Sequence, residues 1–354
     1  LHEQKITISP EGNHMKKLTY VFLFMAMFCV AFGGSIAKAA EYNWKLGHEE
    51  VPGGYYDRLG KEFGKRLAEN SGGKIELKVF PAETIGTSED MLELVRTDAI
   101  QFNFASAGHI GSLVPEAQVM LLHYLFPKDI NVAKEVLQNG KFRELLNPCY
   151  EDKGLEPLMY GTEGWQVWTT NKLIRTPEDM SGVKFRTATS RLIVDSYKAY
   201  GANPTPVPFS EVYSGLQLNM IEGQENPVFV AYDMKFYEVQ KYLTFAYVYP
   251  FPYALIAGSK FMASLPADIQ EIVRKTANEL TAYSFQLQEE YNNEMLERIK
   301  QDKPDMEIVH LTDAEIAAFA KLATPVHKVY IEMAPEKGPA ILKALQEDIK
   351  NFSK

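Results

Sequence analysis

The stretch Ser71-Gly72-Gly73-Lys74-Ile75-Glu76-Leu77-Lys78-Val79 carries the pattern that decides the fold. Between Lys74 and Val79, charged and apolar residues alternate, which predicts a β-strand with one buried and one solvated face. The two glycines before the strand are typical of a helix C-terminus. Leu59, Phe63 and Leu67 recur every four residues and predict the helix that ends there.

The same alternation of strand and helix continues outward from this stretch. Residues 42–46 predict a preceding strand, Thr87 and Asp90 resemble a helix-capping pair, and residues 101–105 predict the next strand. A second set of strand and helix patterns follows between residues 155 and 208, and its first element is a predicted strand over 155–168. Such an order predicts an α/β fold in which helices cover the sheets.

Two lobes are expected, because the mature chain of about 315 residues exceeds the size at which single cores usually stop growing. Of the predicted helices, the one over 229–243 is long enough to pass from one lobe to the other, and Pro266 opens another long helix. The predicted boundaries assign residues 40–163 with about 252–291 to lobe I, and 164–251 with about 292–354 to lobe II.

Residues 1–39 are interpreted as a leader and a secretory signal peptide. Met15, Lys16 and Lys17 precede a mostly apolar run over 18–32, and Ala37-Lys38-Ala39 gives the small-x-small pattern of a cleavage site. The apolar run is shorter than a membrane anchor needs. A periplasmic protein, secreted through the Sec pathway, is therefore expected.

Net charge limits the expected binding partners, and cysteine content limits the expected disulfides. Without residues 1–39 the chain loses four lysines and two glutamates, so its formal net charge changes from −9 to −11. Nucleic acid and anionic lipid are poor partners for such a chain. Only Cys149 remains, so no internal disulfide is expected.

Catalytic motifs are missing from the sequence. We find no Gly-x-Ser-x-Gly elbow, no His-Glu-x-x-His helix and no phosphate-binding glycine loop. The nearest approach to a metal site is His48-Glu49-Glu50, which lacks a second histidine at metal-ligand spacing. No catalytic residue, metal or cofactor is predicted, and the chain is not expected to be an enzyme.

Arg186 is the most informative single residue. It ends the strand pattern Val183-Lys184-Phe185-Arg186, and an arginine that points into a closed space needs a partner. That partner is either a carboxylate of this chain or a ligand carboxylate held by the flat guanidinium fork. The residues alone leave both interpretations open.

Four motifs in this part of the chain closely resemble the core signature of solute-binding proteins of TRAP transporters, of the C4-dicarboxylate and sialic-acid type. They are Gly182-Val183-Lys184-Phe185-Arg186, Pro208-Phe209-Ser210-Glu211-Val212-Tyr213, Glu222-Gly223-Gln224-Glu225-Asn226-Pro227 and Lys235-Phe236-Tyr237-Glu238-Val239-Gln240-Lys241. The resemblance implies a two-lobed periplasmic binding protein fold with a helix that spans both lobes. It also implies secondary transport, in which the lobes close over a small carboxylate and deliver it to small and large integral membrane subunits.

The resemblance also assigns roles to residues. It implies that Arg186 forms the salt bridge to the ligand carboxylate, that Asn226 hydrogen-bonds nearby, and that Phe209 packs on the bound solute. Many relatives have a second arginine where this chain has Gln166. Glu49, Ser106 and His109 also depart from the sialic-acid type, so classical C4-dicarboxylate or sialate binding is not expected.

Aromatic residues complete the predicted site. If the strand is regular, Trp168 lies on the same face as Gln166, and with Phe209, Phe251 and Tyr253 it could form an apolar pocket around one carboxylate anchor. The hypothesis is an aromatic or apolar monocarboxylate as ligand, and the alternative is that these residues are plain core. Thr189 completes the set of candidate ligand-binding residues.

Two rival functions remain at this point. A stand-alone sensory binding protein would share the same fold and site. A secreted hydrolase would need a nucleophile or an acid–base pair, which the sequence does not supply.

Overall fold

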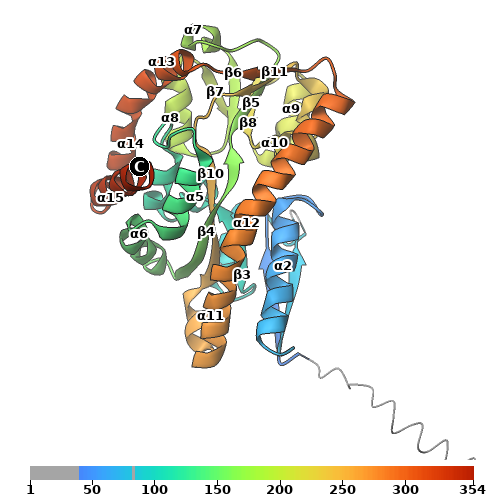
Figure 1. The fold of residues 1–354 in the computed structure, drawn as a ribbon, viewed down its shortest axis with the longest axis vertical. Coiled ribbons are helices and arrows are strands. Elements are labelled where there is room, and N and C mark those ends of the chain that lie inside the picture. The colour runs from blue at the N-terminus through green and yellow to red at the C-terminus, as the bar shows by residue number, and fades with distance from the viewer. Residues whose placement is uncertain (1–39, 82–83) are drawn as a thin grey trace, which may run out of the picture. The chain divides into compact units, whose positions relative to one another are not determined.

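Two β-sheets built from non-consecutive strands form the framework of the chain (Figure 1). The structure, a computed structural model, describes residues 40–81 and 84–354. The predicted signal peptide falls on residues 1–39 and lies outside the described residues. Among the residues described, no helix is both long and apolar enough to cross a lipid bilayer.

The first sheet combines parallel and antiparallel pairing. β1 pairs in parallel with β2 and β3, and β10 pairs antiparallel with β3 and β4. Its order is β2 (Ile75–Phe80), β1 (Tyr42–Gly47), β3 (Phe102–Ser106), β10 (Pro250–Gly258) and β4 (Leu155–Trp165).

The second sheet is also mixed, since β6 is parallel to β7 and β8 while β5 is antiparallel to β8 and β9. Its order is β11 (Glu307–His310), β9 (Tyr242–Phe245), β5 (Val167–Thr170), β8 (Gly223–Asn226), β6 (Lys184–Thr187) and β7 (Asn203–Pro206).

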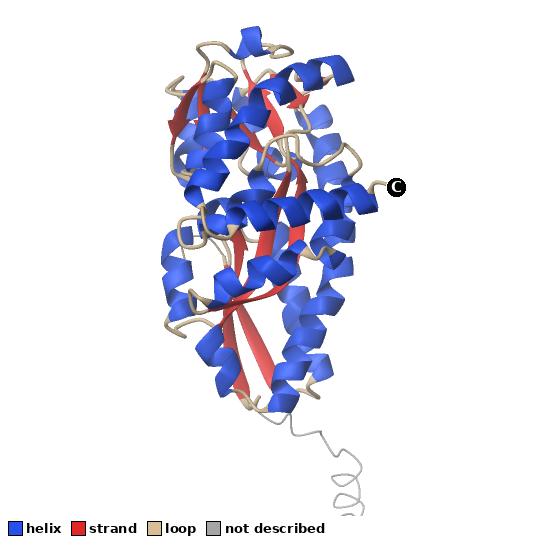
Figure 2. Cartoon of the chain, turned by 90° about the vertical axis from the view of Figure 1, so that its left-hand side faces the viewer, coloured by secondary structure: helices blue, strands red, loops and turns tan. Residues whose placement is uncertain are grey.

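Helices flank the strands of both sheets, as Figure 2 shows. The longer ones are α2 (Tyr55–Asn70), α3 (Ser88–Arg96), α5 (Ile130–Asn139), α6 (Phe142–Glu151), α8 (Arg191–Ala199), α12 (Ala267–Asp302), α13 (Asp313–Ala323) and α15 (Gly338–Phe352). The shorter ones are α4 (Ala107–Ile110), η1 (Pro115–Leu121), α7 (Pro177–Met180), η2 (Phe209–Glu211), α9 (Val212–Gln217), α10 (Val228–Asp233), η3 (Phe236–Val239), α11 (Ser259–Ser264), η4 (Thr324–Val326) and α14 (His327–Met333).

The stretch at 71–79 forms the elements that its pattern predicts. Helix α2 ends at Asn70, and Gly72 and Gly73 follow with φ of 63° and 81°, in the left-handed region that favours glycine. Strand β2 begins at Ile75. The capping pair is also confirmed: the Thr87 side chain accepts from the Asp90 N–H, and the Asp90 carboxylate accepts from the Thr87 N–H.

The helix that passes along both sheets is α12, and the prediction of such a helix over 229–243 is wrong. α10 ends at Asp233, Lys235 adopts a φ of 59°, and the chain then pairs in the second sheet as β9. By contrast, α12 runs for 36 residues from α11 to the neighbourhood of α10 (Figure 1). The Asn292 side chain of α12 connects β4 with α10. It donates to the Glu163 carbonyl oxygen of β4 and accepts from the Phe229 N–H of α10.

Besides α12, which lies between β10 of the first sheet and β11 of the second, the chain crosses between the sheets at two neighbouring points. The strand predicted over 155–168 divides at Gln166 into β4 of the first sheet and β5 of the second. Gly164 has a φ of 99° at this division, and the Gln166 N–H donates to the Tyr249 carbonyl oxygen at 3.2 Å. Residues 246–249 make the return crossing between β9 and β10.

The lobe boundaries drawn from the sequence remain a proposal. The strands of the first sheet lie in the ranges assigned to lobe I except for the last two residues of β4 and the first two of β10, and those of the second sheet lie in the ranges assigned to lobe II. The C-terminal helix α15, assigned to lobe II, instead contacts α5 and α6, and its Asp348 carboxylate accepts from the Phe142 N–H at 2.8 Å.

Candidate functional site

A cavity of about 530 Å³ lies between elements of the two sheets. A second cavity, of about 800 Å³, adjoins it and shares Glu49, His109, Arg186, Ala188 and Phe209 with it. The first, which we call the inner cavity, is lined by Glu49, Glu50, Tyr56, His109, Glu163, Gln166, Arg186, Ala188, Phe209, Glu225, Asn226, Val230, Tyr249 and Phe251. Residues of both sheets therefore face one space.

Arg186 reaches this space from β6 with 5% of its surface exposed. Its Nε and Nη2 atoms donate to the Val207 carbonyl oxygen at 3.1 and 2.9 Å, and its Cζ lies 6.0 Å from the Phe209 ring centroid. No carboxylate of the described residues lies within the 4.0 Å of an ion pair, and Nη1 has no hydrogen-bond partner among them. Burial lowers the pKa of Arg186 to about 10, so the guanidinium remains charged at neutral pH.

Glu225, on β8, is the acidic neighbour of Arg186 on the same side of the cavity. Both of its oxygens are engaged by tyrosines, since Tyr197 donates at 2.6 Å and Tyr249 at 2.9 Å. Burial raises the pKa of Glu225 to about 7, while the two hydrogen bonds and the Arg186 charge act in the opposite direction. This carboxyl is consequently a weak counter-ion for Arg186.

The raised pKa of Glu225 predicts a pH-dependent stability. The folded state holds the proton up to a pKa of about 7 and the unfolded chain only to about 4.5, so this contribution is complete below pH 4.5 and is lost as the pH rises through 7. Glu225→Gln should therefore flatten the fall in unfolding free energy over this window, measured by urea denaturation at several pH values. Glu50 and Glu163 titrate in both proteins, and identical pH profiles would contradict the assignment.

Glu50 and Glu163 form an acidic pair on the opposite wall. Glu163 accepts from the Tyr56 hydroxyl, and Glu50 accepts from the Tyr56 N–H at 2.7 Å through Oε2. Burial, together with the neighbouring Glu163 carboxyl, raises the pKa of Glu50 well above its usual range, and burial does the same for Glu163. The Oε1 atoms of Glu50 and Gln166 are buried and accept no hydrogen bond from the described residues.

Glu49 and His109 form an ion pair at the boundary of the two cavities. Burial lowers the pKa of His109, but the charge of Glu49 and its hydrogen bond to the imidazole, with a smaller contribution from Glu89, together outweigh burial, and the net shift is upward. Burial likewise opposes ionisation of Glu49, yet His109 holds its pKa below the ordinary value. Each of the two groups therefore favours the charged form of the other.

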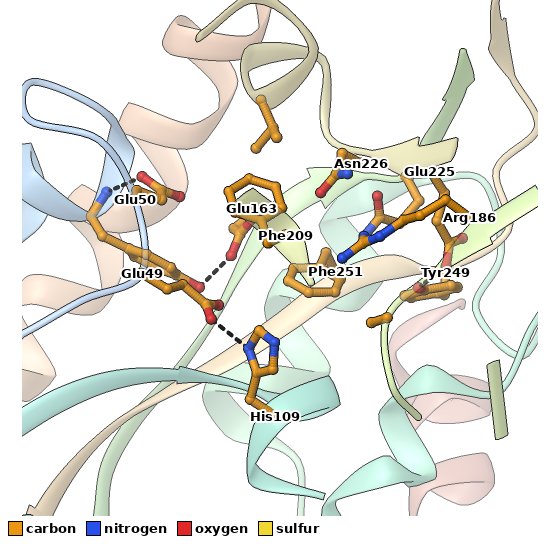
Figure 3. A pocket seen from close by; sticks show the side chains of 14 residues that line it. Glu49, Glu50, His109, Glu163, Arg186, Phe209, Glu225, Asn226, Tyr249 and Phe251 are labelled. Atoms are coloured by element: carbon orange, nitrogen blue, oxygen red, sulfur yellow. Dashed lines mark hydrogen bonds and ion pairs between the residues drawn. The ribbon is translucent and has the colours of Figure 1, made fainter. Parts of the chain in front are cut away.

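The close view in Figure 3 shows the two ends of the site. Glu49, Glu50 and Glu163 gather on one side of the view, and Arg186 and Asn226 on the other, with Phe209 and Phe251 drawn between them. A guanidinium faces an acceptor-rich wall across aromatic rings. Such a site suits a small molecule with a carboxylate at one end and hydrogen-bond donors at the other.

Seven of the residues proposed from the sequence line the inner cavity: Glu49, His109, Gln166, Arg186, Phe209, Asn226 and Phe251. Thr189 lines the adjoining cavity. Ser106 lies behind His109, with its Oγ 3.0 Å from Nδ1. The roles of these residues in binding remain predictions.

Trp168 and Tyr253 lie outside both cavities, which corrects their placement in the pocket. The Trp168 indole is fully buried and donates to the Tyr197 hydroxyl at 2.7 Å. The same-face rule fails because Gln166 is not part of a strand but sits at the division between β4 and β5. The Tyr253 hydroxyl lies 2.8 Å from that of Tyr55 in the core under the first sheet.

Several lining residues escaped sequence reasoning. Glu225 directly precedes Asn226 in a motif already singled out, and Glu50 was considered only as part of a possible metal cluster. Among the residues that the structure describes, no group of three or more His, Cys, Asp or Glu side chains could hold a metal ion.

Glu163 also escaped prediction. Its position within a mostly buried strand was the signal that could have indicated a functional acid. The pocket is accordingly mixed, not apolar as expected.

Comparisons with known proteins agree with this architecture. The family model of the bacterial extracellular solute-binding proteins, family 7 (DctP), matches residues 53–333. The ectoine/5-hydroxyectoine-binding periplasmic protein UehA of Ruegeria pomeroyi is 36% identical over 335 residues, which are 94% of this chain and 98% of that protein.

Solved structures show the same likeness. The periplasmic ectoine-binding protein of the TeaABC TRAP transporter of Halomonas elongata has a TM-score of 0.84 and 34% identity, over 87% of this chain and 99% of that one. A TRAP periplasmic solute-binding protein of Desulfovibrio salexigens with bound orotic acid has a TM-score of 0.83 and 28% identity, over 88% and 99%. These comparisons confirm the two-lobed α/β fold and a non-enzymatic role. The chain therefore belongs to family 7 of the bacterial extracellular solute-binding proteins, the periplasmic proteins that bind small molecules for the membrane subunits of TRAP transporters.

Proposed function

We propose that this protein captures a small organic carboxylate on Arg186 and delivers it to its TRAP membrane subunits. One observation carries the proposal: a buried, charged guanidinium faces the inner cavity with Nη1 unpartnered among the described residues. A buried unpaired charge is unfavourable, and a ligand carboxylate would supply the missing partner. The membership of a relative in a TRAP transporter supports transport over the sensory alternative.

The opposite wall supports a ligand that also carries donors. The unpartnered Oε1 atom of Gln166 is an amide oxygen and can only accept, so a ligand must bring an N–H or O–H group to it. The unpartnered Oε1 atom of Glu50 also accepts whenever that carboxyl is ionised. Two relatives are named for binding ectoine, a ring that carries both a carboxylate and a delocalised N–H cation. A compact amphoteric ring compound matches both ends of the cavity.

The aromatic or apolar monocarboxylate predicted from the sequence is the second candidate. Phe209 and Phe251 support it, since both rings line the inner cavity and would pack against a flat ligand. An aryl acid without donors would leave the buried acceptor of Gln166 unpaired, at a cost of about 1–3 kcal/mol. That loss makes the amphoteric ligand the better match.

Calorimetric titration with four carboxylates separates the candidates. We expect ectoine to bind more tightly than phenylacetate by at least tenfold, with orotate between them, because ectoine and orotate carry N–H donors and phenylacetate does not. Succinate should bind weakly, since His109, the other basic group on the lining, is already paired with Glu49 and is not available to a second carboxylate. Phenylacetate binding more tightly than ectoine would contradict the amphoteric ligand and favour the aryl acid.

We also propose that residues 1–39 direct secretion and are then removed. Membership in a periplasmic family supports export, and the charged start, apolar run and Ala37-Lys38-Ala39 support cleavage. The mass of the exported chain tests this, because cleavage there predicts a mature start at Ala40 or Glu41.

A further inference from the structure

Two serine side chains hold the Glu49–His109 pair in place, one from α3 and one from the end of β3. The Ser88 hydroxyl, at the start of α3, donates to Glu49 Oε2 at 2.8 Å, and Glu49 pairs with His109 of α4. His109 Nδ1 lies 3.0 Å from the hydroxyl of Ser106, at the end of β3. The Glu49 carboxylate is thereby fixed to one wall of the cavity.

The wall across the cavity carries Arg186. Glu49, His109 and Arg186 all line both cavities, so the three charges face one space from elements of the two sheets. They also influence one another, because Glu49 favours the charged form of Arg186 while Arg186 disfavours the charged form of His109. Glu49 is thus an acid of this chain that could compete for Arg186.

The carboxylates near Arg186 are both engaged elsewhere. The Glu225 oxygens accept from Tyr197 and Tyr249, and Glu49 is bound by Ser88 and His109. On each wall of the cavity, the carboxylate nearest to Arg186 is therefore held by other side chains. Neither carboxylate forms an ion pair with the guanidinium. On the Glu49 side, His109 supplies the only opposing charge within ion-pair distance among the described residues.

We propose that His109 is a positioning residue that holds the Glu49 carboxylate away from Arg186 and so keeps the guanidinium available to a ligand. The inference rests on the proposed role of Arg186 in ligand binding. Without the His109 charge, Glu49 can pair with Arg186 across the cavity. Such a pair would occupy the ligand's anchor and would join the two lobes in the absence of solute, which lowers the fraction of binding-competent protein.

The test measures lobe closure without any ligand. Nitroxide labels on Lys74→Cys and Lys198→Cys, exposed positions on the two lobes, report the interlobe distance by double electron–electron resonance, while the native Cys149 is buried. In solute-free protein, His109→Leu should shift the distribution to shorter distances. The closed population should increase about tenfold, the change expected when two close charges on opposite walls become coupled.

Two further variants separate positioning from a general structural effect. Adding Glu49→Gln to His109→Leu should restore the wild-type distribution, because the competing charge is gone. His109→Lys, which keeps a cation beside Glu49, should leave the distribution unchanged. If His109→Leu does not fold, His109→Ala provides the same comparison.

Two results would overturn the proposal: an unchanged distribution in His109→Leu, or a shift that persists in the double variant. Neither depends on knowing the solute. A failure of the carboxylate titrations would instead count against the proposed function and would leave the distance measurement interpretable.

Discussion

Replacing Arg186 with alanine is expected to weaken binding of the best carboxylate in the titration panel by about 2–5 kcal/mol. The guanidinium is 5% exposed, it has no acidic partner among the described residues, and it contributes the cationic surface at one end of the inner cavity. Without the guanidinium, the ligand carboxylate loses its charged hydrogen-bond donors in a site where water cannot fully replace them. Calorimetry with the purified variant measures the change.

Arg186→Lys is the matched control for this prediction. Lysine keeps the charge but not the planar fork, so an intermediate loss of affinity is expected. Circular dichroism of both variants verifies that the fold persists. Equal affinities of the wild type and Arg186→Ala would show that the carboxylate binds elsewhere in the cavity.

Trp168→Ala is expected to lower the free energy of unfolding by about 3–5 kcal/mol. The indole is fully buried, lies 5.1 Å from the Phe319 ring and 6.3 Å from the Phe185 ring between centroids, and donates to Tyr197. Alanine leaves a cavity in the core of the second sheet and removes the hydrogen bond. Urea denaturation monitored by far-ultraviolet circular dichroism measures the loss.

Trp168→Phe separates packing from ligand contact. Phenylalanine fills most of the space, so a smaller destabilisation is expected, and ligand affinity should stay within about twofold of wild type because the indole lies outside both cavities. A large loss of ligand affinity with little loss of stability would show that Trp168 contacts the ligand after all.

Local patterns predicted the fold wherever local interactions decide it. The alternation from Lys74 to Val79 and the capping residue Thr87 are confirmed, because side-chain period and capping hydrogen bonds act over a few residues. The errors lie where distant segments compete. The strand predicted over 155–168 is divided between the two sheets. The helix predicted over 229–243 ends early, because its last residues belong to β9, which pairs with β5 and β11.

The candidate site was likewise predicted only in part. Arg186 and Asn226 were predicted from motifs, and the structure places both on the inner cavity. The pairing of Glu50 with Glu163 joins residues more than a hundred positions apart, and nothing in the local sequence indicates that both carboxyls are buried. Trp168 was misplaced because a regular strand was assumed through Gln166, where the chain changes sheets.

The central claim is that the Arg186 guanidinium is the anchor of a ligand carboxylate. A crystal structure of the protein with the solute that co-purifies from its native host tests this most directly. The account predicts a carboxylate of that solute within about 3 Å of the guanidinium nitrogen atoms, with its donors turned toward Gln166 and Glu50. A solute that occupies the inner cavity without contacting Arg186 would contradict it.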